Sequence, residues 1–510
     1  MNWTAIVVFV LLFGFITILG FIAGRWRRGD LDLLHEWGLG GRRFGSVVVW
    51  FLLGGDLYTA YTFVAVPALV FGAGAIGFFA VPYTILIYPL VFLILPRFWL
   101  VAHKHNYITA ADFVRGRYGN RWLALAIAVT GIIATMPYIA LQLVGLQVVI
   151  AGMGVEGGGF LGDLPLIIAF VILAAFTYTS GLRAPAMIAI VKDLLIYLTV
   201  LAMIIVIPIE IGGYGKMFSL VPAAKVILAA PKAGTLGLYS AYATLALGSA
   251  FALFLYPHSV TGVLSSSGPE VIRRNAVYLP AYSVMLGLLA LTGFMALALG
   301  VDKLPEFAAQ FAHYKATFTV PALILHAFPS WFAGIAFAAI GIGALVPAAI
   351  MSIASANLFT RNIYREFFRP NATDREESRN AKLVSLIVKA GALIFILFVP
   401  TQYAIYLQLL GGVWISQTIP SVIIGLYTRW FNPWALFLGW LAGMVVGSWM
   451  SISLNFAAVF PLTIGGLAVP GYTALYALIA NFAVSIVLTP VCNAIAASRG
   501  SDQTVAADYR

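Results

Sequence analysis

Thirteen apolar runs, each long enough to cross a lipid bilayer, follow one another along this chain of 510 residues. A spanning helix needs about 20 apolar residues, because it rises 1.5 Å per residue through a hydrocarbon core about 30 Å thick. Charged residues make up only 9% of the chain, against about 25% in a soluble domain. We therefore predict an all-α polytopic membrane protein. The runs lie near residues 4–24, 46–73, 79–100, 122–152, 164–180, 185–211, 236–263, 276–300, 333–360, 383–399, 403–427, 434–454 and 471–492.

Arginine is concentrated in three loops that share one side of the membrane if the spans are right: 25–45, 97–121 and 361–382. Basic loops of membrane proteins stay in the cytoplasm. With an odd number of spans, we expect the N-terminus outside and the C-terminus in the cytoplasm of an inner (plasma) membrane. The first run is not expected to be a signal peptide, because arginines follow it and no positive charge precedes it.

Composition and motifs exclude several other classes of protein. The net charge of +11 does not indicate nucleic-acid binding, since the basic residues lie between apolar runs. The single cysteine, Cys492, excludes an internal disulfide and gives no metal site. The chain has no HExxH or GxSxG motif, so we expect neither an enzyme nor a cofactor other than a coupling ion. A transporter-like nutrient sensor is kept as an alternative, although such a protein usually carries an output domain and eighteen residues follow Cys492.

Two spans carry interruptions. Run 46–73 contains Gly54-Gly55-Asp56, and run 236–263 contains Gly248-Ser249-Ala250 and then Tyr256-Pro257-His258. They are the second and seventh spans, as expected for an inverted repeat of five helices each. Interrupted spans at matching positions of two halves predict the binding site of a secondary transporter. The alternative is that glycine only allows close helix packing; the neighbouring acid Asp56 favours a site.

Lys192 and Asp193 stand side by side inside run 185–211, where a charge costs several kcal/mol. Asp193 is expected to point about 100° away from Lys192 around the helix and to face Tyr197 or a neighbouring helix. Lys192 could instead extend its ammonium to the membrane surface. We favour a functional role for this lysine, for a reason that depends on a family resemblance.

Four stretches of the chain resemble the sodium:solute symporter family, which has the leucine-transporter (LeuT) fold. The resemblance covers roughly residues 40–430. Within the family, YPHSVTGVLSS (256–266) and GDLYTAYTF resemble the monocarboxylate and acetate permease branch. The four stretches are GGRRFGSVVVWFLLGGDLYTAYTFVAVPALVFGAG (40–74), HNYITAADFVRGRYG (105–119), YTSGLRAPAMIAIVKD (178–193) and AAIMSIASANLFTRNIY (348–364).

This resemblance implies a LeuT-type 5+5 inverted repeat over 46–430, preceded by a leading helix and linker over 1–45 and followed by two trailing helices and a tail over 431–510. It also implies a cation site formed by the carbonyls of Gly54, Leu57 and Ala349 and the hydroxyl of Ser352. The chain departs from the family pattern where Ile353 replaces a second hydroxyl and Ala189 replaces an acid.

Lys192 offers a substitute for the missing sodium ligands. It follows Ala189 by three residues, so both share a helix face, and an ammonium carries the same unit charge as sodium. We predict that Lys192 stands where relatives bind sodium and that a proton is the coupling ion, with Asp193 and His258 as further coupling residues. Sodium coupling through the remaining ligands is the alternative.

The predicted substrate is a small monocarboxylate of the lactate, pyruvate or acetate class, imported by a protein that is expected to be a monomer in the bilayer. Backbone N–H groups of a broken helix supply donors for a carboxylate. Tyr61 and Tyr138, taken singly, are more typical of packing residues than of ligands, and Gln142 could equally bridge two helices. The residues predicted to bind substrate are Asp56, Tyr58, Thr59, Tyr61, Tyr138, Gln142 and Tyr256.

Overall fold

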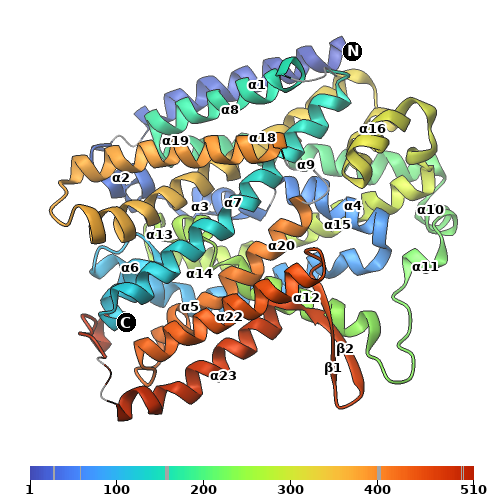
Figure 1. Ribbon diagram of the computed structural model, residues 1–510. Helices are drawn as coiled ribbons and strands as arrows, with labels where there is room; N and C mark the ends of the chain where they lie inside the picture. The colour runs from blue at the N-terminus through green and yellow to red at the C-terminus, as the bar shows by residue number, and fades with distance from the viewer. Residues whose placement is uncertain (27–28, 58, 156–159, 399–403, 496, 498) are drawn as a thin grey trace.

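The computed structural model is a bundle of long helices that run between two ends of the molecule (Figure 1). The structure describes residues 1–510 except 27–28, 58, 156–159, 399–403, 496 and 498. The N-terminus lies at the end of the bundle that carries α10 (Tyr214–Leu220) and α16 (Ala308–Tyr314). The C-terminus lies at the opposite end, near α6 (Ala110–Tyr118).

The first half of the chain forms one leading helix and the first set of core helices. Short helices connect them: α2 (Leu34–Leu39), η3 (Tyr61–Ala65), η4 (Gly74–Phe79) and α11 (Ala223–Val226). The long elements are α1 (Trp3–Ile22), α3 (Ser46–Leu57), α4 (Val66–Ala73), α5 (Ala80–Lys104), α7 (Arg121–Gly152), α8 (Phe160–Ser180) and α9 (Arg183–Ile211).

The second half repeats this arrangement and adds two helices. The segment before α18 is built from short helices that include α17 (Thr319–Ala327), and η8 (Thr360–Phe368) continues α18. The elements are α12 (Gly237–Leu253), α13 (Pro257–Leu264), α14 (Pro269–Tyr278), α15 (Pro280–Leu299), α18 (Ser330–Phe359), α19 (Asp374–Phe398), α20 (Ala404–Ile415), α21 (Ile419–Val422), η11 (Ile424–Leu426), α22 (Pro433–Ser453) and α23 (Thr473–Ala494).

The part of the chain that the structure describes holds 11 helices long and apolar enough to cross a membrane, or 12 if the bent pair α12 and α13 is one span. One of the 11 covers Tyr61–Lys104, whose 44 residues would extend about 66 Å as a straight helix, twice the hydrocarbon thickness. Dividing this segment at η4, and joining its first part to α3 across the break, gives the thirteen predicted spans.

Both predicted interruptions exist, and both pack against α7. Residues 46–73 break between α3 and η3, and α12 meets α13 at a bend of 49°. Pro257 begins α13, where its missing N–H leaves no helical hydrogen bond unmade. Glycine on α7 admits each break, since a Cβ at Gly145 would lie 2.4 Å from the Cβ of Ala60, and one at Gly131 would lie 2.9 Å from Pro257.

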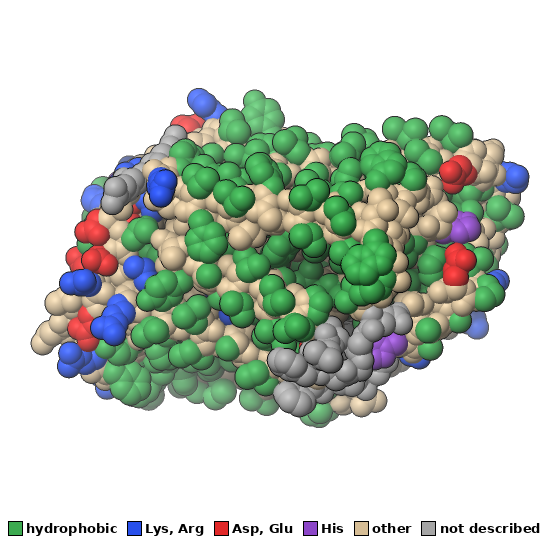
Figure 2. Space-filling model, turned by 90° about the horizontal axis from the view of Figure 1, so that it is seen from above, with side chains coloured by type: hydrophobic (Ala, Val, Ile, Leu, Met, Phe, Trp, Pro, Cys, Tyr) green, Lys and Arg blue, Asp and Glu red, His purple; other side chains and the backbone are tan. Residues whose placement is uncertain are grey.

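Burial separates a central helix from the lipid-facing ones. Within α18 and η8, 94% of the most apolar window is buried, and α18 packs against α1, α7, α9 and α19. The corresponding value for α1 is only 28%. Figure 2 shows apolar side chains over the middle of the molecule and most of the charged ones at its two ends, the distribution that a protein embedded in a bilayer requires.

One element departs from the all-α prediction. Strands β1 (Val459–Ile464) and β2 (Leu467–Tyr472) form an antiparallel hairpin between α22 and α23. Gly465 and Gly466 make its turn, with φ of 56° and 85°, the positive values that a two-residue hairpin turn needs. Because the hairpin adds only two strands outside the helix bundle, the fold class remains that of a helical membrane protein.

Candidate functional site

Lys192 lies at the centre of the molecule rather than at its surface. Its side chain is fully buried on α9, and its Nζ donates a hydrogen bond of 2.7 Å to the carbonyl of Gly55. Gly55 belongs to the last turn of α3, just before the break. The alternative that this lysine extends to the membrane surface is therefore wrong. A helix break leaves carbonyls free for a cation, and here an ammonium occupies one.

Asp193 shares this position, contrary to the expectation from helical spacing. Its Oδ1 lies 3.0 Å from the Lys192 Nζ, and its Oδ2 accepts a hydrogen bond of 2.6 Å from the hydroxyl of Tyr282 on α15. The long side chain of lysine bends around the helix and compensates for the 100° between neighbouring residues. The expectation that Asp193 faces a neighbouring helix is confirmed by Tyr282, whose ring also packs on Tyr197 with centroids 5.8 Å apart.

The two glycines of α3 have different neighbours. Lys192 donates to the carbonyl of Gly55, whereas the resemblance implies the carbonyl of Gly54 as the cation ligand. At Gly54 a Cβ would lie 2.1 Å from the Tyr282 ring, so close helix packing explains this glycine. The side chains of Asp56 and Leu57, and all of Tyr58, lie outside the described residues, so their predicted roles stay predictions.

Ser352 and Ala349 form a second polar cluster on α18. The Ser352 hydroxyl donates to the Ala349 carbonyl at 2.8 Å and accepts from Ser385 of α19 at 3.3 Å. Ser385 in turn accepts a hydrogen bond of 2.7 Å from the ammonium of Lys389. Ser352 and Lys192 are both expected at the cation site, but the hydrogen bonds of this serine run to its own helix and to α19.

The backbone of the first break is already partly satisfied. The Ala60 N–H donates to the side-chain oxygen of Gln142 at 2.9 Å, and the Tyr61 N–H donates to the Thr59 hydroxyl at 3.0 Å. Gln142 also donates to the Tyr138 carbonyl on α7. Gln142 therefore holds the broken helix against α7, and these two N–H groups, predicted to bind a carboxylate, have protein acceptors in this structure.

An aromatic cluster surrounds the second break. The rings of Tyr138, Tyr256 and His258 lie 5.3–5.5 Å apart by their centroids, and all three are buried. The Tyr256 hydroxyl donates to the carbonyl of Gln408 on α20 at 3.3 Å. The structure thus brings three predicted residues together at α7 and α13. On α7, Tyr138 and Gln142 lie between Gly131, which packs against the second break, and Gly145, which packs against the first.

Sequence reasoning missed three residues of this region. Tyr282 and Lys389 are buried partners of predicted site residues. The side-chain oxygen of Gln408 is buried and has no hydrogen-bond partner among the described residues. Lys389 could have been found by the rule that singled out Lys192, a charge within an apolar span. Tyr282 carries no such signal, because tyrosine is common in apolar helices.

The four stretches that resemble the symporter family meet in pairs at one end of the bundle. Arg183 is fully buried and donates to the Glu36 carbonyl at 2.8 Å and to the Glu36 carboxylate, which also pairs with Arg43. Thr109 and Asp112 both bond to Asn362, each at 2.8 Å. Much of the resemblance therefore rests on residues that tie loops together rather than on the cation site.

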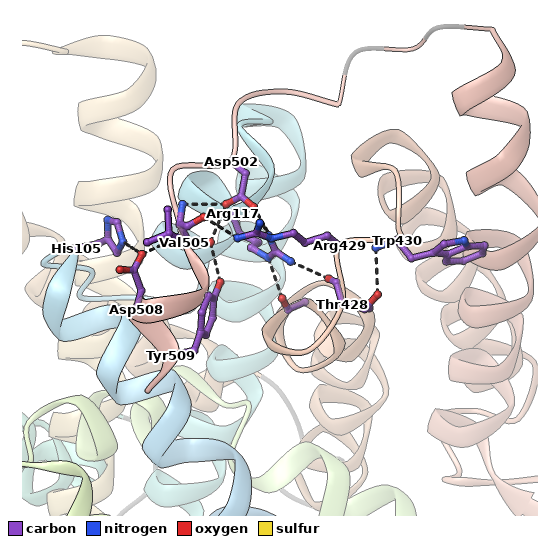
Figure 3. Close-up of polar contacts among 11 residues, drawn as sticks. His105, Arg117, Thr428, Arg429, Trp430, Asp502, Val505, Asp508 and Tyr509 are labelled. Atoms are coloured by element: carbon purple, nitrogen blue, oxygen red, sulfur yellow. Dashed lines mark hydrogen bonds and ion pairs between the residues drawn. The ribbon is translucent and has the colours of Figure 1, made fainter.

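The last residues of the chain are fixed at the same end by ion pairs (Figure 3). Asp502 pairs with Arg117 and, at 3.2 Å, with Arg429. Asp508 lies 2.7 Å from the Lys104 Nζ and 2.8 Å from the His105 Nε2. Arg117 also donates to the carbonyls of Gly425 and Thr428 at 2.9 Å, so the tail joins α5 and α6 to the end of η11.

The pKa of Asp508 shows how strongly the tail is held. Burial acts to raise this pKa, but hydrogen bonds from Lys104, from the Val505 N–H and from His105 outweigh it and keep the pKa well below the usual range of an aspartate. The carboxylate is therefore charged at any physiological pH. Among the described residues, no group of three or more His, Cys, Asp or Glu is placed to hold a metal ion.

Comparison with known proteins decides the family. The family model described as the sodium:solute symporter family matches residues 37–447. The chain belongs to this family. Its members and its relatives are transporters, so this symporter is a membrane transport protein and not an enzyme. A structure described as the substrate-bound outward-open state of a Na⁺-coupled sialic acid symporter matches with a TM-score of 0.77 at 13% identity, over 96% of this chain and 98% of that one. The match confirms the predicted LeuT-type fold.

Two curated relatives match almost end to end. The symporter is 49% identical over 98% of its length to 99% of a monocarboxylate transport permease protein of Rhizobium johnstonii. It is 33% identical over 96% of its length to 94% of the uncharacterized symporter YodF of Bacillus subtilis. Together with the apolar surface, these findings establish an integral membrane symporter of small solutes.

Proposed function

We propose that this symporter imports small monocarboxylates of the lactate, pyruvate and acetate class across the plasma membrane, with a proton as the coupling ion. In this proposal Lys192 is a fixed cation at the place where the family resemblance implies sodium. The N-terminus faces outside and the C-terminus faces the cytoplasm, as the arginine-rich loops predict.

The observation that carries the proposal is the hydrogen bond from the Lys192 ammonium to the Gly55 carbonyl. A carbonyl at the end of a broken helix is a ligand for a monovalent cation, and here a protein cation fills it. The neighbouring changes agree with this, since Ala189 and Ile353 are fully buried and offer no oxygen from their side chains. Hard cations need a shell of oxygens, and these two side chains supply none.

The substrate class is supported by the relative named as a monocarboxylate permease and by the composition of the region between the two breaks. The buried tyrosine and histidine rings of α7 and α13 give an apolar wall with polar edges, which suits an anion with a short aliphatic part. Gln408 adds a buried amide oxygen that is free to accept from a hydroxyl of such a substrate.

Uptake of labelled lactate into proteoliposomes tests the proposal, with an inward pH gradient and with or without sodium. We expect accumulation to follow the pH gradient and not to change with sodium. Lys192→Met should lower uptake by about tenfold or more, as the loss of a hydrogen bond from a charged donor predicts. Lys303→Met, at an exposed lysine of η5 (Val301–Lys303), is the matched control and should not change uptake.

Sodium coupling is the second candidate, since the family and the structurally similar sialic acid symporter are both named for sodium. It predicts that uptake requires a sodium gradient and is indifferent to the pH gradient. That result would reject the proton and the role given to Lys192 while leaving the substrate class standing. Absence of lactate, pyruvate and acetate uptake under every gradient would reject the substrate class.

A further inference from the structure

A second lysine is buried in the bundle, and nothing in the proposed function uses it. Lys389 is 1% exposed. It lies fifteen residues after Asp374, the first residue of α19, which places it about 22 Å along the helix and far from either end of the span. Lysines at such depth are rare, and an ionisable residue inside a membrane span indicates a functional site.

The side chain of Lys389 leads directly to the residues of the candidate cation site. Its ammonium donates to the Ser385 hydroxyl at 2.7 Å, and Ser385 donates to the Ser352 hydroxyl at 3.3 Å. Ser352 completes the chain by donating to the Ala349 carbonyl at 2.8 Å. Every hydrogen bond in this chain points from Lys389 towards α18. Because each hydroxyl has one proton to donate, the direction of all these hydrogen bonds depends on whether Lys389 is protonated.

No carboxylate balances Lys389 in the part of the chain that the structure describes. Helices α2, α7, α8, α18 and η8 pack against α19. Of these α18 has no titratable side chain, and none of the groups on the others forms an ion pair or hydrogen bond with Lys389. They are His35 and Glu36 on α2; Arg121 and Tyr138 on α7; Asp163 and Tyr178 on α8; Arg361, Tyr364, Arg365 and Glu366 on η8; and Asp374, Arg375, Glu376, Glu377, Arg379 and Lys382 on α19 itself.

Several of these groups are engaged with other partners. Glu36 pairs with Arg183 and Arg43, and Glu377 pairs with Arg361 and Arg365. The other charged groups of α19 lie in its first nine residues. The nearest along the helix is Lys382, about 10 Å from Lys389 by helical rise, and it donates to the Leu31 carbonyl. Lys389 is thus an ammonium in an apolar environment with a neutral hydroxyl as its partner.

Lys192 is in the opposite situation. Its ammonium lies 3.0 Å from the carboxylate of Asp193 and donates to a carbonyl. A carboxylate at that distance stabilises the charged form of a lysine. Among the described residues, Lys192 thus has a carboxylate beside its ammonium, whereas Lys389 has a hydroxyl as its hydrogen-bond partner. Moving a proton through Lys389 therefore breaks no ion pair that the described residues form.

We propose that Lys389 carries the coupled proton, a proposal that rests on proton coupling as given above. In each cycle the neutral Nζ takes one proton from water on the outer side and returns one proton to water on the inner side, so the residue ends as it began. The protonated amine has three donors and no acceptor, and it fixes Ser385 as an acceptor. The neutral amine has a lone pair that accepts the Ser385 proton, which withdraws that proton from Ser352 on α18.

The test compares two transport modes of the same proteoliposomes in sodium-free buffer. Exchange of labelled for unlabelled lactate at equal pH on both sides needs no net proton movement, whereas accumulation under a pH gradient needs it. We expect Lys389→Met to keep exchange and to lose accumulation. Lys389→Arg keeps a positive charge that is never released, so it should also lose accumulation, whereas a residue that only supplies charge or packing would be rescued by arginine.

Ser385→Ala is a second test of the proposal if the Lys389 variants do not fold. It removes the hydroxyl that links Lys389 to Ser352 and should lower the ratio of accumulation to exchange. The proposal would be overturned if Lys389→Met or Ser385→Ala accumulated lactate as the wild type does, with the same ratio of accumulation to exchange. Loss of exchange in a folded Lys389→Met would also overturn it. Failure of the proposed function is distinguishable, because the wild type itself would then show no pH-driven accumulation.

Discussion

A Cβ atom at Gly55 would lie 2.7 Å from the Nζ of Lys192. Heavy atoms do not approach a Cβ so closely, so the absence of a side chain at Gly55 is what allows the ammonium to reach the carbonyl of the same residue. Gly54, one position earlier, faces the Tyr282 ring instead, with a Cβ distance of 2.1 Å. Of two adjacent glycines, Gly55 thus leaves room for the ammonium of Lys192, and Gly54 leaves room for the ring of Tyr282.

Gly55→Ala is expected to impair transport more than folding. The atom that the new methyl group meets is the end of a flexible lysine side chain, which can move aside and lose its hydrogen bond to the break. We expect lactate uptake to fall by about tenfold, the effect of losing one strong polar interaction, while the unfolding temperature in detergent changes little. A large loss of stability with normal uptake per folded molecule would contradict this interpretation of Gly55.

Gly54→Ala is expected to do the reverse. Its methyl group meets a buried ring that is fixed between Trp50 and Tyr197, with centroids 4.7 Å and 5.8 Å from that of Tyr282. Inserting a methyl group into a packed core costs about 1–3 kcal/mol. Thermal unfolding of the purified protein measures this loss. Gly45→Ala serves as the control, because a Cβ at Gly45 would meet nothing within 4 Å.

The hydrophobic pattern of the sequence predicts most of this fold. Spanning length, the positions of the two breaks and the inverted relation between them follow from apolar runs and from glycine and proline within them. The hairpin β1–β2 does not follow, because its alternation is short and Pro461 and Pro470 interrupt it. The boundary inside the helical segment 61–104 does follow from the pattern, because runs 46–73 and 79–100 separate near Gly74, where φ is 78°.

The candidate site is predictable to a smaller extent, because its contacts join residues far apart in the sequence. Lys192 stands out as a charge in an apolar span, but the atom it binds does not: the choice between the carbonyls of Gly54 and Gly55 depends on the rotation of α3 against α9. The pairing of Lys192 with Asp193 depends on how a flexible side chain bends. The hydroxyl chain from Lys389 depends on the packing of α19 on α18, which no local pattern specifies.

The Lys192–Asp193 pair predicts an asymmetry between single and double substitutions. Asp193→Asn removes the carboxylate charge 3.0 Å from a buried ammonium, and breaking such a pair costs about 3–5 kcal/mol. The double variant Lys192→Met, Asp193→Asn removes both charges and should recover most of the stability, although not transport. Chemical unfolding of the two variants and the wild type measures the difference. Equal losses in the single and double variants would mean that the pair is not coupled.

The C-terminal tail gives a prediction for pH. Because the pKa of Asp508 is held below its ordinary value, the contribution of this carboxylate is complete above the pKa of a free aspartate, about 4, and is lost only as pH falls through the lower folded value. Deuterium exchange of the amides of residues 501–509, corrected for intrinsic rates, should therefore show no loss of protection between pH 7.5 and about 5.

Asp508→Asn should abolish that protection at neutral pH, since the amide cannot replace the charged acceptor that Lys104, His105 and the Val505 N–H share. Asp302→Asn, at an exposed acid in η5, is the control and should leave the tail protected. Loss of protection in the wild type between pH 7.5 and 5 would mean that another group controls the tail. The tail joins α5 and α6 to the end of η11, so its release should also change how fast these helices move. Lactate exchange measured on the same Asp508→Asn sample therefore tests whether the contacts of the tail affect transport.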